Sequence, residues 1–185
     1  MQASSPSSYP WVMPTLVMDP APAEIDALIE HRRRLDLDHR DEVWEGVLHM
    51  NPPPSVEHQY LAQQLAELLA PLARRSGLFP LIQVFGVGEG RDDYRVPDGG
   101  LFRSQPHGVW QGTAALVIEV LSPDDKTWAK FEFYAAHEID ELLIVDPKER
   151  GVQWFALQDG EYRPIEHSTL IDLGQSDLAG QIDWP

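Results

Sequence analysis

A short apolar segment at 113–123 carries a single charged side chain, Glu119, and ends in a Ser-Pro pair. An apolar run of this length that stops at proline is typical of a buried strand. Because successive side chains of a strand point to opposite faces, Glu119 shares its face with Val117 and Leu121. An ionised carboxylate inside a buried sheet is costly unless it is paired, hydrogen-bonded or bound to a metal. The pattern therefore predicts a specific partner for Glu119.

Apolar residues at helical spacing predict a helix over 23–35 and a second helix that begins after Ser55, a suitable N-cap. The second helix carries an apolar stripe formed by Leu61, Leu65, Leu68, Leu69 and Leu72. A third helix is expected over 123–137, with Ser122 as its N-cap. Strand-like patterns occur at 41–50, 78–87, 94–103, 141–146, 152–157 and 162–166.

Two glycine-containing stretches predict turns. The glycine-rich segment 86–93 is followed by acidic residues and opens no helix, so it indicates a hairpin turn and not a phosphate-binding loop. Asp159-Gly160 separates two of the predicted strands in the same way.

The order of helices and strands predicts the fold class α/β (α+β), with a mixed central β-sheet flanked by helices. Residues 1–20 contain Ser, Pro and scattered apolar side chains, and we expect a flexible N-terminal arm there. Residues 21–185 are expected to form a single domain.

Charge and composition narrow the function. The chain of 185 residues has a formal net charge of −16, which argues against broad electrostatic binding to nucleic acid or to anionic membranes. It contains no cysteine and no run near the ~20 apolar residues that a membrane span needs. Its first twenty residues do not resemble a signal peptide, so we expect a cytoplasmic protein without membrane attachment.

Three residues are candidates for chemistry. Asp98 follows Pro97 in a strand-like segment, although Pro-Asp-Gly is also an ordinary turn sequence. Glu119 could equally be one half of a buried ion pair. Lys130 shares a helix face with Tyr134, four residues on, and both side chains lean back toward the helix start, where the strand of Glu119 ends. A lone helical lysine is usually solvated, so these residues become informative only as a group.

As a group they suit metal-assisted phosphodiester hydrolysis. Two carboxylates from adjacent strands can hold Mg²⁺, which prefers oxygen ligands and keeps several waters. A nearby lysine can stabilise charge on a phosphoryl oxygen or on an attacking water. The sequence offers no zinc-protease spacing, no nucleophile elbow and no Walker-type glycine loop.

Five segments in order resemble the Uma2 family, formerly DUF820. They are 41–58, Tyr-Arg-Val-Pro-Asp at 94–98, Val-Ile-Glu-Val-Leu-Ser-Pro at 117–123, Lys-Phe-Glu-Phe-Tyr-Ala-Ala at 130–136 and Glu-Leu-Leu-Ile-Val-Asp-Pro at 141–147. The family is classed with the restriction-endonuclease-like, PD-(D/E)XK fold. The resemblance covers about residues 40 to 160 and implies a restriction-endonuclease-like core.

The resemblance also implies a site. Its metal ligands, for Mg²⁺ or Mn²⁺, would be Asp98, Glu119 and the backbone carbonyl of Val120. Glu42 matches the acidic residue of the family's first motif and is expected to approach the same site. His58 matches a recurrent histidine, for which we expect a hydrogen bond at the helix start and not metal ligation.

One position departs from the superfamily pattern. The usual lysine lies two residues after the second acid, where this chain has Leu121. Lys130 occupies the matching position within the family, so the helix would supply the cation, with Tyr134 beside it. A catalytic site requires the cationic group at the correct position in space, whichever part of the sequence supplies it.

Three functions remain open from the sequence. The first is a Mg²⁺-dependent nuclease that cleaves DNA, a partner that the net charge disfavours. The second is a catalytically inactive nuclease-fold domain that acts in binding or assembly, which the charge and Leu121 favour. The third is hydrolysis of a small phosphate ester at the same site. A homodimer is expected in each case, with Trp110 or Trp154 as candidate interface residues.

Overall fold

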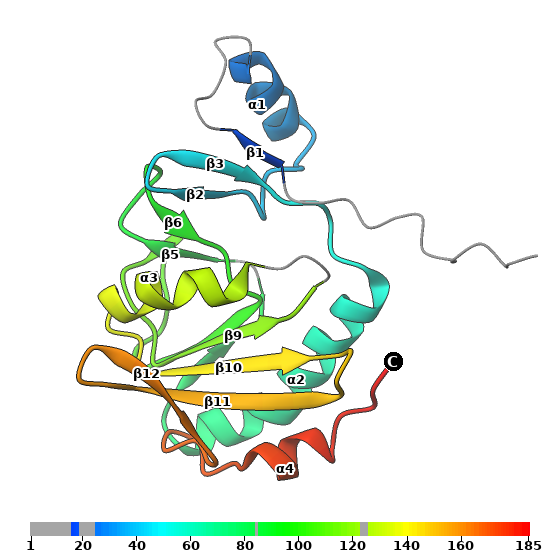
Figure 1. Cartoon of the computed structure of the whole chain (residues 1–185), viewed down its shortest axis with the longest axis vertical. Helices are drawn as coiled ribbons and strands as arrows, with labels where there is room; N and C mark the ends of the chain where they lie inside the picture. The colour runs from blue at the N-terminus through cyan, green and yellow to red at the C-terminus, as the bar shows by residue number, and fades with distance from the viewer. Residues whose placement is uncertain (1–15, 19–24, 84, 123–125) are drawn as a thin grey trace, which may run out of the picture.

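The computed structural model describes residues 16–18, 25–83, 85–122 and 126–185. Its strands form two sheets, one above the other in Figure 1. Sheet A contains, in spatial order, β1 (Leu16–Met18), β3 (Val47–Met50), β2 (Glu42–Trp44), β6 (Tyr94–Arg95), β5 (Gly86–Gly88) and β8 (Trp110–Gln111). Sheet B contains β12 (Glu161–Ile165), β11 (Gly151–Gln158), β10 (Glu141–Asp146), β9 (Leu116–Val120), β7 (Gly99–Phe102) and β4 (Phe79–Leu81).

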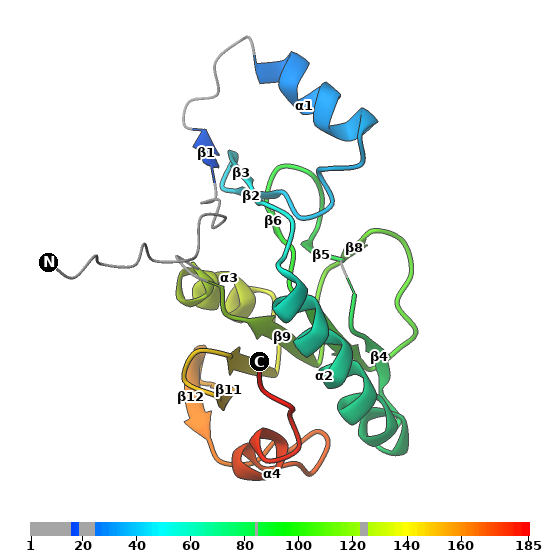
Figure 2. The same ribbon diagram turned by 90° about the vertical axis from the view of Figure 1, so that its right-hand side faces the viewer.

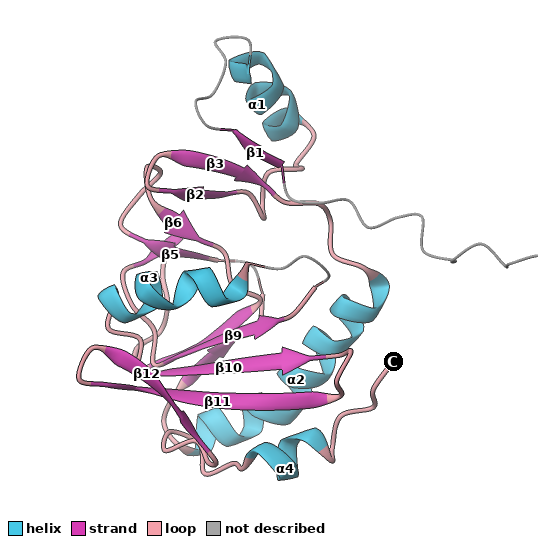
Figure 3. Cartoon of the chain, viewed as in Figure 1, coloured by secondary structure: helices cyan, strands magenta, loops and turns pink. Residues whose placement is uncertain are grey.

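The helices cover the outer end of sheet A and both faces of sheet B (Figure 3). They are α1 (Ile25–Arg34), α2 (Val56–Arg75), the 3₁₀ turn η1 (Thr127–Lys130), α3 (Phe131–Ala136) and α4 (Gln175–Ala179). Figure 2 shows α2 and α3 on opposite sides of β9. The predicted α+β class with mixed sheets flanked by helices is confirmed, but the strands divide between two sheets instead of one.

Strand β9 lies inside sheet B, parallel to β10 and antiparallel to β7. All of its residues are buried, as expected for a strand with covered faces. Ile118 packs in the core on the α2 side, and Val117 packs in the core on the α3 side. Glu119 is on the face of Val117, so its side chain points toward α3.

Helix α2 begins as its sequence predicts. The Ser55 side chain accepts a hydrogen bond from the backbone N–H of His58, at 3.2 Å. Satisfying an exposed backbone donor in this way is the usual role of an N-cap serine. Leu61, Leu65 and Leu69 are fully buried against sheet B.

Segment 41–50, expected as one strand, is the hairpin of β2 and β3. Glu45 and Gly46 form its turn with φ of 49° and 84°. Positive φ at both central residues is the signature of a tight hairpin turn, and glycine adopts it without steric cost. The glycine therefore lets the chain reverse within a segment that was expected to be one strand.

Segments 78–87 and 94–103, also expected as single strands, are each divided between the two sheets. Pro97 interrupts the second segment, because proline has no N–H to give to a ladder. The predicted hairpin is confirmed, since β5 pairs antiparallel with β6, but Gly86–Gly88 belong to the strand and the turn is formed by 89–93.

The helix predicted over 123–137 begins later than expected. Lys126 is not helical and η1 starts at Thr127, so Ser122 is not an N-cap; residues 123–125 lie outside the described residues. Of the expected N-terminal arm, 16–18 form β1 against β3, and the remainder lies outside the described residues.

Hydrogen bonds to a buried acid, Glu141, hold the C-terminal segment against sheet B. Glu141, at the start of β10, is 1% exposed. Ser168 Oγ donates to its Oε2 at 2.6 Å, and the backbone N–H and hydroxyl of Thr169 donate to its Oε1 at 2.7 Å. These bonds satisfy a carboxylate that would otherwise be costly to bury. They connect the segment that leads to α4 with sheet B.

Two further expectations concern surfaces. Trp154 is fully buried, so its predicted contribution to an interface is wrong; Trp128, by contrast, is 51% exposed. Trp154 packs in the core cluster that α4 helps to cover, which explains its burial. In the described part of the chain, no helix has the length and apolar character required to cross a bilayer.

Candidate acidic site between the two sheets

The predicted site residues meet where the chain passes from sheet A to sheet B. Residues 96–98 connect β6 of sheet A to β7 of sheet B. The register of β7 with β9 pairs Gly99 with Ile118, so Asp98 and Glu119 are the residues directly next to that pair, one on each chain segment. The charge of Asp98 contributes to the raised pKa of Glu119, which shows that the two carboxylates lie within electrostatic range of each other. The two predicted acids are therefore neighbours.

Asp98 is almost completely buried and is held by three donors. Arg40 Nη1 lies 2.7 Å from its Oδ1, His58 Nε2 lies 2.8 Å from the same oxygen, and the backbone N–H of Val120 donates to Oδ2 at 2.9 Å. Burial alone would raise the pKa of Asp98. The contacts with His58, Arg40 and the Val120 N–H outweigh burial and lower that pKa to about 2. Asp98 is therefore ionised at neutral pH.

Glu119 is equally buried but has the opposite tendency. Lys130 Nζ lies 3.0 Å from its Oε1, and the Tyr134 hydroxyl donates to the same oxygen at 2.5 Å. Burial raises the pKa of Glu119 to about 8, with the nearby carboxylates of Asp98 and Glu42 acting in the same direction and Lys130 opposing them. Burial and Glu119 also raise the pKa of Tyr134 well above its ordinary value, so its hydroxyl keeps its proton.

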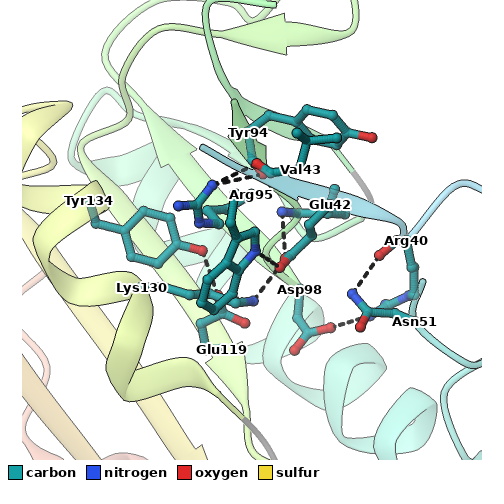
Figure 4. A network of polar contacts seen from close by, with 12 residues as sticks. Arg40, Glu42, Val43, Asn51, Tyr94, Arg95, Asp98, Glu119, Lys130 and Tyr134 are labelled. Atoms are coloured by element: carbon teal, nitrogen blue, oxygen red, sulfur yellow. Dashed lines mark hydrogen bonds and ion pairs between the residues drawn. The ribbon is translucent and has the colours of Figure 1, made fainter. Parts of the chain in front are cut away.

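Glu42 brings sheet A into the site (Figure 4). Its Oε1 lies 2.9 Å from Lys130 Nζ and accepts from the backbone N–H of Val96 at 2.9 Å. Its Oε2 accepts from the indole N–H of Trp44 at 2.7 Å. Lys130 is thus the common cation of Glu42 and Glu119, which arrive from different sheets.

His58 bridges the acidic site to the end of β9. Its backbone N–H makes the expected hydrogen bond at the start of α2. Its ring reaches Asp98 through Nε2 and the Ser122 hydroxyl through Nδ1, at 3.2 Å. The ring therefore touches a candidate metal ligand and orients it, as residues around metal ligands commonly do.

Two cations near the site were not predicted from the sequence. Arg40 lies in the loop after α1 and had no periodic pattern to mark it. Arg95 is buried between the rings of Trp44 and Phe133, with centroid distances of 4.5 and 4.0 Å. The alternation of β6 could have indicated an inward Arg95, but the strand is only two residues long.

The carboxylate oxygens of the site are suitable ligands for a hard divalent cation. Within the described residues, both hydrogen bonds to Glu119 arrive at Oε1, and Oδ2 of Asp98 accepts one. Oxygen atoms on two adjacent carboxylates are the ligands that Mg²⁺ prefers. No group of three or more histidine, cysteine, aspartate or glutamate side chains among the described residues is arranged to hold a metal. The Val120 carbonyl as a third ligand stays a prediction.

Comparison with protein families gives a match over residues 28–180 to the Uma2 model, described as "putative restriction endonuclease". The chain belongs to the Uma2 family. A crystal structure of a putative nuclease belonging to DUF820 from Anabaena variabilis resembles this Uma2 chain with a TM-score of 0.60 and 18% identity, covering 76% of this chain and 90% of the other. The likeness extends the family assignment to the fold. No curated protein matches this Uma2 chain.

The departure from the superfamily pattern has a structural counterpart in this Uma2 chain. Leu121, where the superfamily has lysine, packs at the edge of the core on the α3 side. The ammonium group of Lys130 instead reaches the acids from the end of η1. The cation and the acids therefore lie together although their order in the chain differs.

Proposed function

We propose that this Uma2 protein is a Mg²⁺-dependent nuclease that hydrolyses phosphodiester bonds in DNA. The observation that supports the proposal is the proximity of Asp98, just before β7, to Glu119 in β9, with Lys130 in contact with Glu119. Asp98, Glu119 and the Val120 carbonyl would hold the ion. When bound, Mg²⁺ would polarise a phosphoryl oxygen and favour ionisation of a water.

The remaining residues have positioning and electrostatic roles in this proposal. Lys130, fixed by Glu42 on one side and Glu119 on the other, presents an ammonium group to charge that develops on the phosphate. Tyr134 holds Glu119 Oε1 by donating a hydrogen bond to it. His58 holds Asp98 in the same way from the opposite side. Preorganised groups of this kind need not rearrange during the reaction.

Glu119→Gln tests the site assignment. Removing one of two carboxylate ligands should reduce Mg²⁺ affinity at least about tenfold, since a neutral amide replaces a charged ligand. The measurement is calorimetric titration of Mg²⁺ into both proteins, with cleavage of single- and double-stranded DNA followed in parallel. Glu138→Gln, at an exposed residue outside the site, is the matched control. Equal Mg²⁺ affinity in wild type and Glu119→Gln would remove the assignment.

The ion pairs also support a second candidate, a catalytically inactive scaffold. Lys130, Arg40 and His58 already meet the acids, so each carboxylate has a partner without a metal. The net charge of −16 is consistent with this function. In that case the wild type would bind no Mg²⁺ at the site and would cleave neither DNA nor RNA.

The same charge supports a small substrate as a variant of the first proposal. A phosphate monoester or a dinucleotide presents fewer negative charges to an acidic protein than a DNA duplex does. A panel of such substrates, assayed beside DNA with Mg²⁺, distinguishes the two: hydrolysis of the small esters with no DNA cleavage would replace DNA as the substrate.

A further inference from the structure

Arg40 contacts the site with only part of its hydrogen-bonding capacity. Among the described residues its guanidinium donates once, from Nη1 to Asp98 Oδ1 at 2.7 Å. A guanidinium carries five N–H donors. The Arg40 side chain is 25% exposed, whereas that of Asp98 is 5% exposed. The ion pair therefore joins a buried acid to a cation that reaches the surface with donors to spare.

The backbone of Arg40 is held in place by its neighbours. Asn51 donates from its side chain to the Arg40 carbonyl at 2.7 Å, and its backbone N–H donates to the carboxylate of Asp41 at 3.1 Å. Arg32 holds the same carboxylate with two donors, at 2.9 and 2.6 Å. These bonds fix the loop near Asp98, whereas the Arg40 guanidinium is held by one hydrogen bond to that acid.

Arg32 provides an internal comparison. Its forked pair with Asp41, together with a bond to the carbonyl of Leu37, is what a structural arginine makes. Arg40 makes no such fork. Asp98 in turn keeps two other donors, His58 and the Val120 N–H, if Arg40 moves away. Opening this ion pair therefore leaves neither the loop nor the acid without support.

We infer that Arg40 is a phosphate-binding residue, which leaves Asp98 when a cation binds there and engages an anionic oxygen of the substrate. This inference rests on the proposed metal site and adds a substrate contact to it. A planar guanidinium suits this role because it matches the geometry of phosphate oxygens. In a protein of net charge −16, a partly exposed arginine in contact with a site acid has particular weight.

The test compares wild type, Arg40→Gln, Arg40→Lys and the control Arg103→Gln. Arg103 is also paired with an acid, Asp140, at 2.8 Å, but both side chains of that pair are exposed. Two quantities are measured on each folded protein: Mg²⁺ affinity by calorimetry, and affinity for a short labelled phosphorothioate oligonucleotide by fluorescence anisotropy at saturating Mg²⁺. Phosphorothioate linkages keep the negative charge and resist hydrolysis.

Arg40→Gln should weaken oligonucleotide binding about tenfold or more, the effect of losing a charge-assisted bond. It should also strengthen Mg²⁺ binding about twofold to tenfold, because a competing cation has left Asp98. Arg40→Lys should bind the oligonucleotide with intermediate affinity, and Arg103→Gln should match wild type in both assays. A purely structural role would lower the melting temperature of Arg40→Gln and produce neither change.

Oligonucleotide affinity of Arg40→Gln within twofold of Arg103→Gln, or weaker Mg²⁺ binding, would overturn the inference while the metal site remained. If Arg40→Gln does not fold, Arg40→Lys is tested in its place. Wild-type affinities of Arg40→Lys for both Mg²⁺ and the oligonucleotide would then also overturn the inference. Absence of Mg²⁺ binding to the wild type itself would overturn the proposed function and the inference together.

Discussion

At the scale of single residues, Glu119 and Asp98 have the same burial and opposite titration behaviour. Asp98 receives hydrogen bonds at both oxygens from three donors, so its charged form is favoured. Within the described residues, the cation paired with Glu119 is Lys130, which Glu119 shares with Glu42, and two other acids lie nearby. The metal-free protein therefore gains from holding a proton on Glu119, and a bound divalent cation would meet the same need.

This difference predicts the pH dependence of stability. The pKa of Glu119 is raised from 4.5 to about 8 in the folded protein. Between these values the folded state retains a proton that the unfolded state has released, so stability falls as pH rises through the interval. Glu119→Gln cannot lose a proton and escapes that loss. In EDTA its melting temperature should exceed that of wild type by a few degrees at pH 8, and by less near pH 5.

The control is Asp98→Asn, for which the opposite sign applies. The pKa of Asp98 is lowered from 3.8 to about 2, so its contribution is present above pH 3.8 and is lost as pH falls toward 2. Its removal should lower the melting temperature at neutral pH. Parallel melting curves for wild type and Glu119→Gln from pH 5 to pH 8 would contradict the account of Glu119.

At the scale of elements, the N-terminal cap of α2 helps to position His58. Ser55→Ala removes the acceptor for the His58 backbone N–H and should cost about 1 kcal/mol, or about 2–4 °C in melting temperature. Ser55→Asp supplies another capping acceptor and should restore most of the loss. Thermal unfolding followed by circular dichroism measures both; a full-sized loss in Ser55→Asp would mean that the cap is not the cause.

Elements with a long, regular pattern could be predicted from the sequence. The apolar stripe of α2 and the segments that become β9, β10 and β11 have the expected positions, because burial of one face or both fixes their periodicity. The strands of sheet A have two to four residues each, too few for a period to be visible. Their pairing depends on tight turns and on Pro97, which decide where one sheet ends and the other begins.

The same distinction holds for the site. Glu119 was noticeable because its strand is otherwise apolar, and the resemblance to Uma2 located Asp98, Lys130 and Glu42. Arg40 could not be found in this way, since it lies in a loop whose position depends on contacts with Asn51, eleven residues away. Long-range contacts between irregular segments leave no periodic signal in a sequence.

At the scale of the whole molecule, the charge distribution predicts how binding depends on salt. With 30 acidic and 14 basic side chains, the protein has few cations to release counterions from DNA. If Arg40 and Lys130 make the phosphate contacts, the logarithm of affinity for a single strand should fall with the logarithm of salt concentration at a slope near −1.4, about −0.7 for each contact. Anisotropy titrations over a range of salt concentrations measure it. A slope steeper than about −4 would require an extended basic surface elsewhere.

The fastening of Glu141 by Ser168 and Thr169 determines how far the chain can be shortened. A fragment that stopped before those two residues would leave the buried carboxylate of Glu141 without its hydrogen-bond donors, in the strand that pairs with β9. It would also lose the apolar side chains of α4 that cover Trp154. Anyone trimming this protein for expression or fusion should therefore regard its last eighteen residues as part of the folding unit, even though every proposed catalytic group lies upstream of them.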